Sequence, residues 1–116
     1  MEKDVIAAIA WESCFGRAVE KHVKVARYPK LDDAIPDDTL EIQDMITFAE
    51  ANEVFERVRP YTEDQPLFPI YGVLGGSILL MGYGPENRGI VYYLDFDFGL
   101  FELEPLEPFI AALLPR

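Results

Sequence analysis

Residues 68–99 read FPIYGVLGGSILLMGYGPENRGIVYYLDFDFG and hold seven of the eight glycines of the chain. Aromatic and branched aliphatic residues fill the spaces between the glycines, a composition that is typical of strands joined by tight turns. Gly75 and Gly76 separate two short apolar runs, and glycine adopts the positive φ angles of a hairpin turn without steric cost. From Ile90 to Asp97 an apolar face alternates with a face that becomes acidic. The stretch therefore predicts an antiparallel meander.

The glycine cluster is interpreted as the turns of this meander and not as a ligand-binding loop. No lysine follows the cluster and no helix is expected to open there, so free backbone N–H groups are not available to hold a phosphate. A nucleophilic serine at Ser77 would need a base, and the only histidine, His22, stands in a distant segment. We therefore predict that four glycines serve as structural turn residues: Gly72, Gly75, Gly76 and Gly89.

Helical periodicity appears on both sides of the meander. Apolar residues recur at spacings of three and four from Phe48 to Val58, and Pro60 ends the pattern. A second pattern follows Pro105, because proline suits the first turn of a helix, and a third spans residues 2–20. This order of elements indicates an α+β fold, in which an antiparallel β-sheet meander has helices packed on one face.

The length of 116 residues suits one ordinary domain, and we assign residues 1–116 to it. The single cysteine, Cys14, excludes an intramolecular disulfide and a cysteine-based metal site, and it suits a reducing compartment. The opening residues do not have the pattern of a secretory signal, so we expect a cytoplasmic protein. Prolines and glycines interrupt the uncharged stretch 65–85, which argues against a membrane span.

The charge of the chain is strongly negative and unevenly distributed. Twenty-one acidic side chains against ten basic ones give a net charge of −11. Residues 1–31 carry six bases and four acids, whereas residues 32–116 carry four bases and seventeen acids. A body this acidic repels nucleic acid and anionic membranes and attracts a basic protein. Solubility alone is the alternative explanation of the charge.

The sequence offers few candidates for catalysis. Glu102 and Glu104 are expected about 7 Å apart on one face of a strand, a separation that glycosidase carboxylates also show, yet acids on a solvated strand are common without catalysis. The pattern D-x-D-x-G at residues 95–99 lacks the later ligands of a calcium loop. We predict no catalytic residue, no metal and no cofactor.

The succession of these elements resembles the SUKH superfamily, the group founded on a yeast cell-wall synthesis regulator. The likeness covers residues 39–114 and rests on the order and spacing of five elements. They are the segment 39–58, Pro69-Ile70, the cluster of Gly72, Gly75 and Gly76, the strand Gly89-x-Val91-Tyr92-Tyr93 ending in Leu94-Asp95, and the closing Phe109 and Leu113. The resemblance implies an α+β protein-binding module and not an enzyme. Many bacterial members act as immunity proteins that neutralise polymorphic toxins.

An acidic domain of this kind can cover the active cleft of a basic toxin domain, because complementary charge speeds encounter. The candidate partner-binding residues are Asp95, Asp97, Glu102 and Glu104, with Tyr93 as an aromatic anchor. A regulatory or scaffold protein is one alternative. A small ligand-binding or hydrolase domain is another, and it would require a pocket with converging carboxylates. A monomer and a homodimer both remain open.

Overall fold

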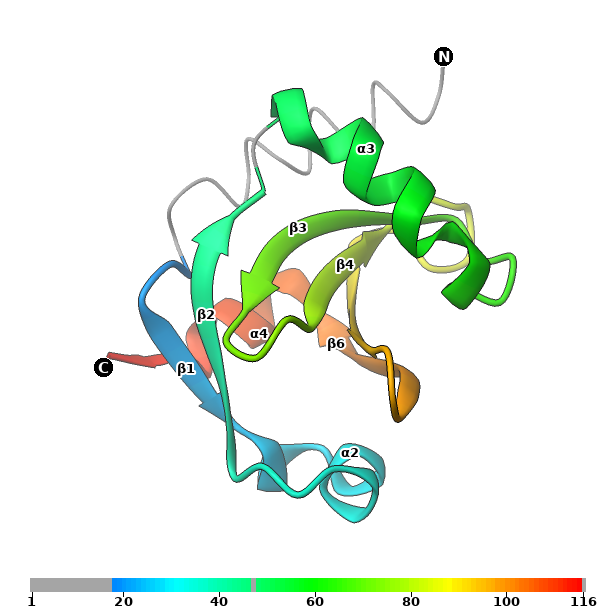
Figure 1. The fold of residues 1–116 in the computed structure, drawn as a ribbon. Coiled ribbons are helices and arrows are strands. Elements are labelled where there is room, and N and C mark those ends of the chain that lie inside the picture. Colours follow the sequence, from blue (N-terminus) through cyan, green and yellow to red (C-terminus); the bar gives the residue numbers. More distant parts are fainter. Residues whose placement is uncertain (1–17, 47, 116) are drawn as a thin grey trace.

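The computed structural model describes residues 18–46 and 48–115, which form one curled sheet with helices around it (Figure 1). The strands are β1 (Lys21–Lys24), β2 (Thr39–Met45), β3 (Leu67–Val73), β4 (Ile78–Gly82), β5 (Ile90–Asp95), β6 (Gly99–Pro105) and β7 (Leu114–Pro115). The helices are the 3-10 helices η1 (Val25–Arg27) and η2 (Arg59–Tyr61) and the α-helices α2 (Pro29–Ala34), α3 (Phe48–Val58) and α4 (Leu106–Ala111). Most of the helix expected over residues 2–20, and Cys14 with it, lies outside the described residues.

The sheet is an antiparallel meander, as the sequence predicts. Its strand order is β6-β5-β4-β3-β2-β1-β7, and every neighbouring pair is antiparallel. Strands β1 to β6 are therefore neighbours in the order in which the chain makes them. Strand β7 returns from the C-terminal end and pairs with β1. The sheet bends strongly, so that β6 faces back toward the segment that leaves β1 (Figure 1).

Helix α3 lies across the outer side of this bend, over β3 and β4 (Figure 1). It is the helix that the periodicity predicts, and Ala51 and Val58 on its inner face are buried. The half-buried ring of Phe55 stacks on Phe68 of β3, with 6.0 Å between the ring centroids. Each fully buried apolar side chain in such a layer contributes roughly 1.5–3 kcal/mol to folding.

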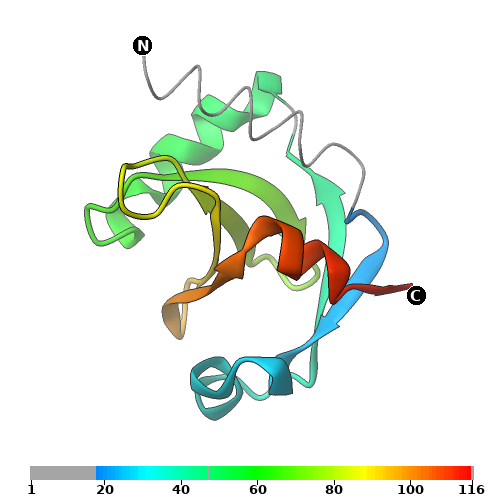
Figure 2. The same cartoon turned by 180° about the vertical axis from the view of Figure 1, so that it is seen from behind.

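Helix α4 lies on the inner side of the bend (Figure 2). Its buried residues Leu106 and Phe109, followed by Leu113, join a core cluster that includes Tyr71 and Tyr93 of the sheet. The short helix α2 adds Leu31 to the same cluster. The described part of the chain contains no helix long and apolar enough to cross a membrane.

Successive residues of the central strands point to opposite faces of the sheet, and here both sets are apolar. Both faces therefore need to be covered by helices. Ile78 and Leu80 of β4 belong to the cluster under α3, whereas Leu79 and Met81 belong to the inner cluster. A strand that is apolar at every position has to be covered on both faces. The predicted α+β architecture is confirmed, and its helices are divided between the two faces of the sheet.

The glycines of the opening stretch do not all serve turns. Gly75 and Gly76, in the turn between β3 and β4, have φ angles of +100° and +97°. Gly89, just before β5, has a φ angle of +81°. Gly72 instead lies inside β3 opposite Asp44 of β2, where an added Cβ would lie 2.5 Å from Asp44 Oδ1. The turn assignment of Gly72 is therefore corrected, because a close approach inside the sheet is what favours glycine at this position.

Candidate partner-binding surface

A hollow lined by acidic side chains lies where the chain leaving α2, the β3–β4 turn and the end of β5 meet. Its volume is about 380 Å³. Four carboxylates line it, and no lysine or arginine is among the described residues that line it. We call this site the acidic hollow, and its polar side chains are Asp37, Asp38, Thr39, Glu41, Ser77, Tyr93 and Asp95. In a chain of this charge it is a site that favours a cationic group of a partner.

Three of the residues that line the acidic hollow are linked by hydrogen bonds. The Tyr93 hydroxyl donates to Ser77 Oγ at 2.8 Å, and the Ser77 hydroxyl donates to Asp95 Oδ2 at 3.4 Å. Burial, with the charges of Asp95 and Asp37 nearby, raises the pKa of Tyr93 to about 12, although the bond to Ser77 opposes the shift. The phenol therefore stays neutral at physiological pH and offers the hollow a polar but uncharged group.

Tyr93 is a core residue with a polar tip, and this position does not suit the exposed aromatic anchor that the sequence suggests. Only 2% of its surface is exposed. Its ring centroid lies 6.4 Å from that of Phe101 within the inner cluster. An exposed Tyr93 would require one face of β5 to be solvated, whereas Tyr93 and its neighbours are buried on both faces.

Asp95 holds the turn between β5 and β6. Its Oδ1 accepts hydrogen bonds from the backbone N–H groups of Asp97, at 2.8 Å, and Phe98, at 3.1 Å. The other oxygen, Oδ2, faces Ser77 and Tyr93 in the hollow. Asp95 thus links the turn to the acidic hollow, whereas the side chain of Asp97 is exposed at the tip of the turn.

Glu102 and Glu104 do not form a pair on one face of β6. The register of β6 against β5 shifts, so that Glu104 lies opposite Val91 while Glu102 lies opposite the next residue, Tyr92. A one-residue bulge moves the following side chains to the other face of a strand. The expected pair is therefore split, with Glu104 on the inner side and Glu102 on the side of α3.

The side chain of Glu104 is bound within the molecule by residues of the segment that follows β1. Arg27 forms a bidentate ion pair with it, with Nε 2.8 Å from Oε2 and Nη2 2.7 Å from Oε1. The Tyr28 hydroxyl also donates a hydrogen bond to Oε2. We call these three residues the clasp, because they join the two sides of the bent sheet. The Arg27 hydrogen bond, assisted by Tyr28, lowers the pKa of Glu104, and burial raises the pKa of Tyr28.

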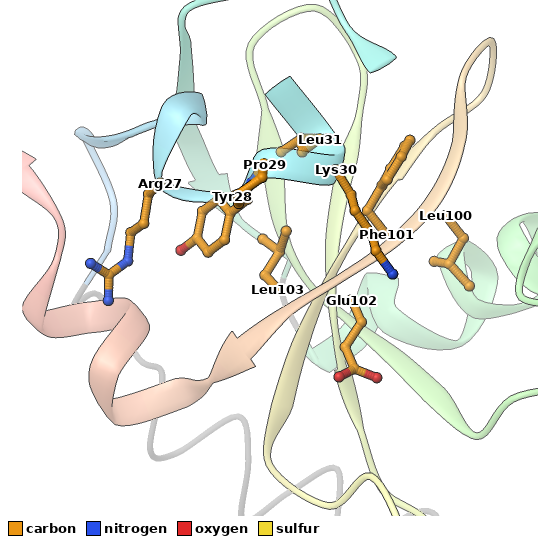
Figure 3. Close-up of a pocket in the computed structure, with 9 residues that line it drawn as sticks. All are labelled: Arg27, Tyr28, Pro29, Lys30, Leu31, Leu100, Phe101, Glu102 and Leu103. Carbon is orange, nitrogen blue, oxygen red and sulfur yellow. The ribbon is translucent and has the colours of Figure 1, made fainter. Parts of the chain in front are cut away.

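A second hollow, of about 620 Å³, lies beside the clasp between α2 and β6 (Figure 3). Tyr28, Leu31, Phe101 and Leu103 point into it, whereas Glu102 points to the other side of β6. A hydrolase site requires converging carboxylates with raised pKa values. Among the described residues that line this hollow, only Glu102 carries a carboxylate, and it points away. Glu104 of the neighbouring clasp is paired with Arg27 and has a lowered pKa. Nor do the described residues contain a group of histidine, cysteine or acidic side chains suited to hold a metal ion.

Three carboxylates of the acidic hollow, those of Asp37, Asp38 and Glu41, are not among the residues that the sequence singles out. Asp37 and Asp38 end the stretch PKLDDAIPDD, whose prolines and aspartates predict an exposed connection although its first six residues form α2. Glu41 belongs to β2. Two consecutive acids directly before a strand were the available signal. Their meeting with Asp95 depends on the bend of the sheet, which no local pattern reveals.

Comparison with known proteins adds a family to this geometry. The family model RhsPI, of Rhs-associated immunity proteins, matches residues 17–114. The chain belongs to the RhsPI family. The match supports the expectation of an immunity protein family, and it identifies this family as RhsPI and not specifically as SUKH. No curated protein matches the chain.

Proposed function

We propose that this chain is the immunity protein of an Rhs toxin and that it neutralises the toxin by binding it. The single observation that carries the proposal is the RhsPI match over residues 17–114. An immunity protein needs no catalytic group of its own, because covering the toxin's active cleft is sufficient. Among the described residues, no group of histidine, cysteine or acidic side chains is suited to hold a catalytic metal ion.

The acidic hollow is the part of the surface that we assign to the toxin. Its carboxylates come from segments far apart in the chain, with Asp37 and Asp38 before β2 and Asp95 at the end of β5. Carboxylates gathered on one concave site attract a basic partner more strongly than the same charges scattered over a surface. We therefore propose a basic toxin domain, with a lysine or arginine cluster that faces the hollow.

The remaining expectations follow from the same proposal. The net charge of −11 disfavours nucleic acid and anionic membrane as partners. A toxin that acts inside a cell has to be met there, so we propose a cytoplasmic location. The resemblance to SUKH over residues 39–114 is retained as a proposal that the two groups of immunity proteins use similar sheets.

The test uses the purified full chain and the toxin domain of the Rhs protein from the same source cells. Association is measured by biolayer interferometry at 50, 150 and 500 mM NaCl. Asp37→Lys is compared with Glu86→Lys, because both residues are exposed, both variants change the net charge equally, and Glu86 lies in the β4–β5 loop away from the hollow. We expect Asp37→Lys to slow association by roughly 10-fold at 50 mM NaCl, with a smaller effect at 500 mM.

Two results would count against the proposal in different ways. If the wild-type chain neither binds the toxin domain nor restores growth of cells that express the toxin, the immunity function is wrong. If the wild type binds while Asp37→Lys and Glu86→Lys associate equally fast, the function stands and the acidic hollow is not its interface.

A further inference from the structure

Three large apolar side chains are exposed on the β5–β6 turn and on the short helix η2, whose Tyr61 contacts Phe96 of the turn. The described part of the chain exposes five large hydrophobic residues, and three of them are Tyr61, at 47%, Phe96, at 40%, and Phe98, at 50%. We call these three residues the aromatic patch. Single exposed apolar side chains are ordinary, but aromatic residues that cluster on a surface mark interaction sites.

The aromatic patch connects two elements that are distant in the sequence. The rings of Tyr61, in η2, and Phe96, in the β5–β6 turn, meet edge to face, with centroids 5.0 Å apart and planes at 87°. Such a contact stabilises two rings against each other. Both rings nevertheless keep a large part of their surface in solvent, so the contact leaves apolar area for a partner.

The backbone under the aromatic patch is held in place by buried or bridging polar groups. Asp95 accepts the N–H groups of Asp97 and Phe98, which fixes the turn that carries both phenylalanines. On the other side, the buried hydroxyl of Thr62 donates to the Arg59 carbonyl at 2.9 Å and fixes the end of η2. A preorganised aromatic group loses little conformational entropy when it binds.

Three exposed acidic residues lie next to the aromatic patch in the sequence. Asp97 stands between the two phenylalanines, and Glu63 and Asp64 follow Tyr61 after one residue; all three are exposed. Glu63 and Asp64 also adopt left-handed backbone conformations, with φ angles of 55° and 62°. Residues other than glycine seldom adopt these angles, and they concentrate at functional sites. A basic surface would complement these acidic residues.

We propose that the aromatic patch is the apolar anchor of the toxin interface, and that it inserts into an apolar depression on the toxin rimmed by lysine and arginine side chains. The inference rests on the proposed function and deepens it. Asp95 joins the patch to the acidic hollow, since one of its oxygens holds the turn and the other faces the hollow. The hollow speeds encounter, and the patch slows dissociation, because buried aromatic residues dominate the binding energy of an interface.

The experiment compares the double variant Phe96→Ala/Phe98→Ala with Leu114→Ala, in the full chain and with the same toxin domain. Leu114 is the matched control, because it is a large apolar residue with 41% exposure in β7, at the far edge of the sheet. Circular dichroism verifies that each variant is folded. We expect the double variant to raise Kd roughly 10- to 100-fold, mainly through faster dissociation, and Leu114→Ala to change it little. Tyr61→Ala is a second variant, which leaves the β5–β6 turn intact.

Ionic strength separates this inference from the proposed function. A lost apolar anchor raises Kd by a similar factor at 50 and 500 mM NaCl, whereas a lost charge acts chiefly at low salt. If the wild type binds and both aromatic variants dissociate as slowly as Leu114→Ala, the aromatic patch is not the anchor and the immunity function stands. If the wild type does not bind at all, the inference falls together with the proposed function.

Discussion

At the scale of single residues, Glu104 shows how sequence position can mislead about role. It belongs to a run of acids that invites assignment to a partner, yet its side chain is only 15% exposed and is bound by Arg27 and Tyr28. A carboxylate that accepts several hydrogen bonds from one site has little capacity left for another protein. Glu104 therefore stabilises the fold, whereas the exposed Glu102 stays a candidate for partner contact.

Replacement of Glu104 by glutamine is expected to destabilise the protein. Glutamine keeps the size of the side chain, but it removes the charge and presents an NH₂ group to one of the donors. The loss is about 1 kcal/mol of the free energy of unfolding at pH 7, a modest value because the ion pair is partly exposed. Urea unfolding followed by circular dichroism measures it, with Glu102→Gln as the control.

The difference in unfolding free energy between wild type and Glu104→Gln has a predictable pH dependence. The pKa of Glu104 is lowered in the folded state, so the stabilisation is complete above the ordinary glutamate pKa of about 4.3. It is lost as the pH falls through the lower, folded value. The difference in unfolding free energy between wild type and Glu104→Gln should therefore shrink at acid pH. A difference that stays constant down to pH 3 would contradict the role of the charged clasp.

At the scale of elements, the β5–β6 hairpin combines a structural and a binding role in adjacent residues. Asp95 accepts two backbone N–H groups inside the turn, whereas Asp97 is exposed at its tip. A charge reversal at both positions would therefore disturb the turn as well as the surface charge. The two acids have to be tested separately.

Asp95→Ala and Asp97→Ala should have different effects on stability. Asp95→Ala leaves two turn N–H groups without their acceptor and is expected to cost about 1–2 kcal/mol. Asp97→Ala should change the unfolding free energy by less than about 0.5 kcal/mol, as is usual for an exposed residue. Thermal and urea unfolding of the two variants provide the comparison. Equal losses would show that Asp95 does not hold the turn.

The same hairpin shows how far the sequence determines fold and site. Period-2 alternation predicts strands over residues 90–97 and beyond, and the structure has strands at Ile90–Asp95 and Gly99–Pro105. Alternation does not predict that both faces of β5 are buried, which makes Tyr93 a core residue, or that the strand ends at Asp95, which leaves Phe96 in a turn. The bulge that separates Glu102 from Glu104 depends on pairing between strands, so it cannot be predicted from the spacing of residues within one strand.

At the scale of the whole molecule, the two edges of the sheet are protected against further strand pairing. The edge β6 is bridged to the segment after β1 by the clasp and ends at Pro105. The other edge, β7, contains only Leu114 and Pro115. Short strands, proline and charge at an edge all discourage pairing with another chain, and a net charge of −11 adds repulsion between copies.

We expect the free protein to be a monomer for these reasons. Sedimentation velocity between 50 and 500 mM NaCl should show one species with the mass of a single chain over a wide concentration range. Because salt screens the repulsion, the high-salt measurement is the stricter one. A sedimentation coefficient that rises with protein concentration would contradict the prediction and favour a homodimer.

The clasp also bears on the kinetics of folding. Arg27 and Glu104 are 77 positions apart, so their contact closes one of the longest loops in the chain. Such contacts bear a large loop-closure entropy and tend to form after the local hairpins of a meander. Interactions that are absent from the transition state alter the unfolding rate and leave the folding rate nearly unchanged. The clasp therefore governs the lifetime of the folded state, through the unfolding rate, more than it governs the folding rate.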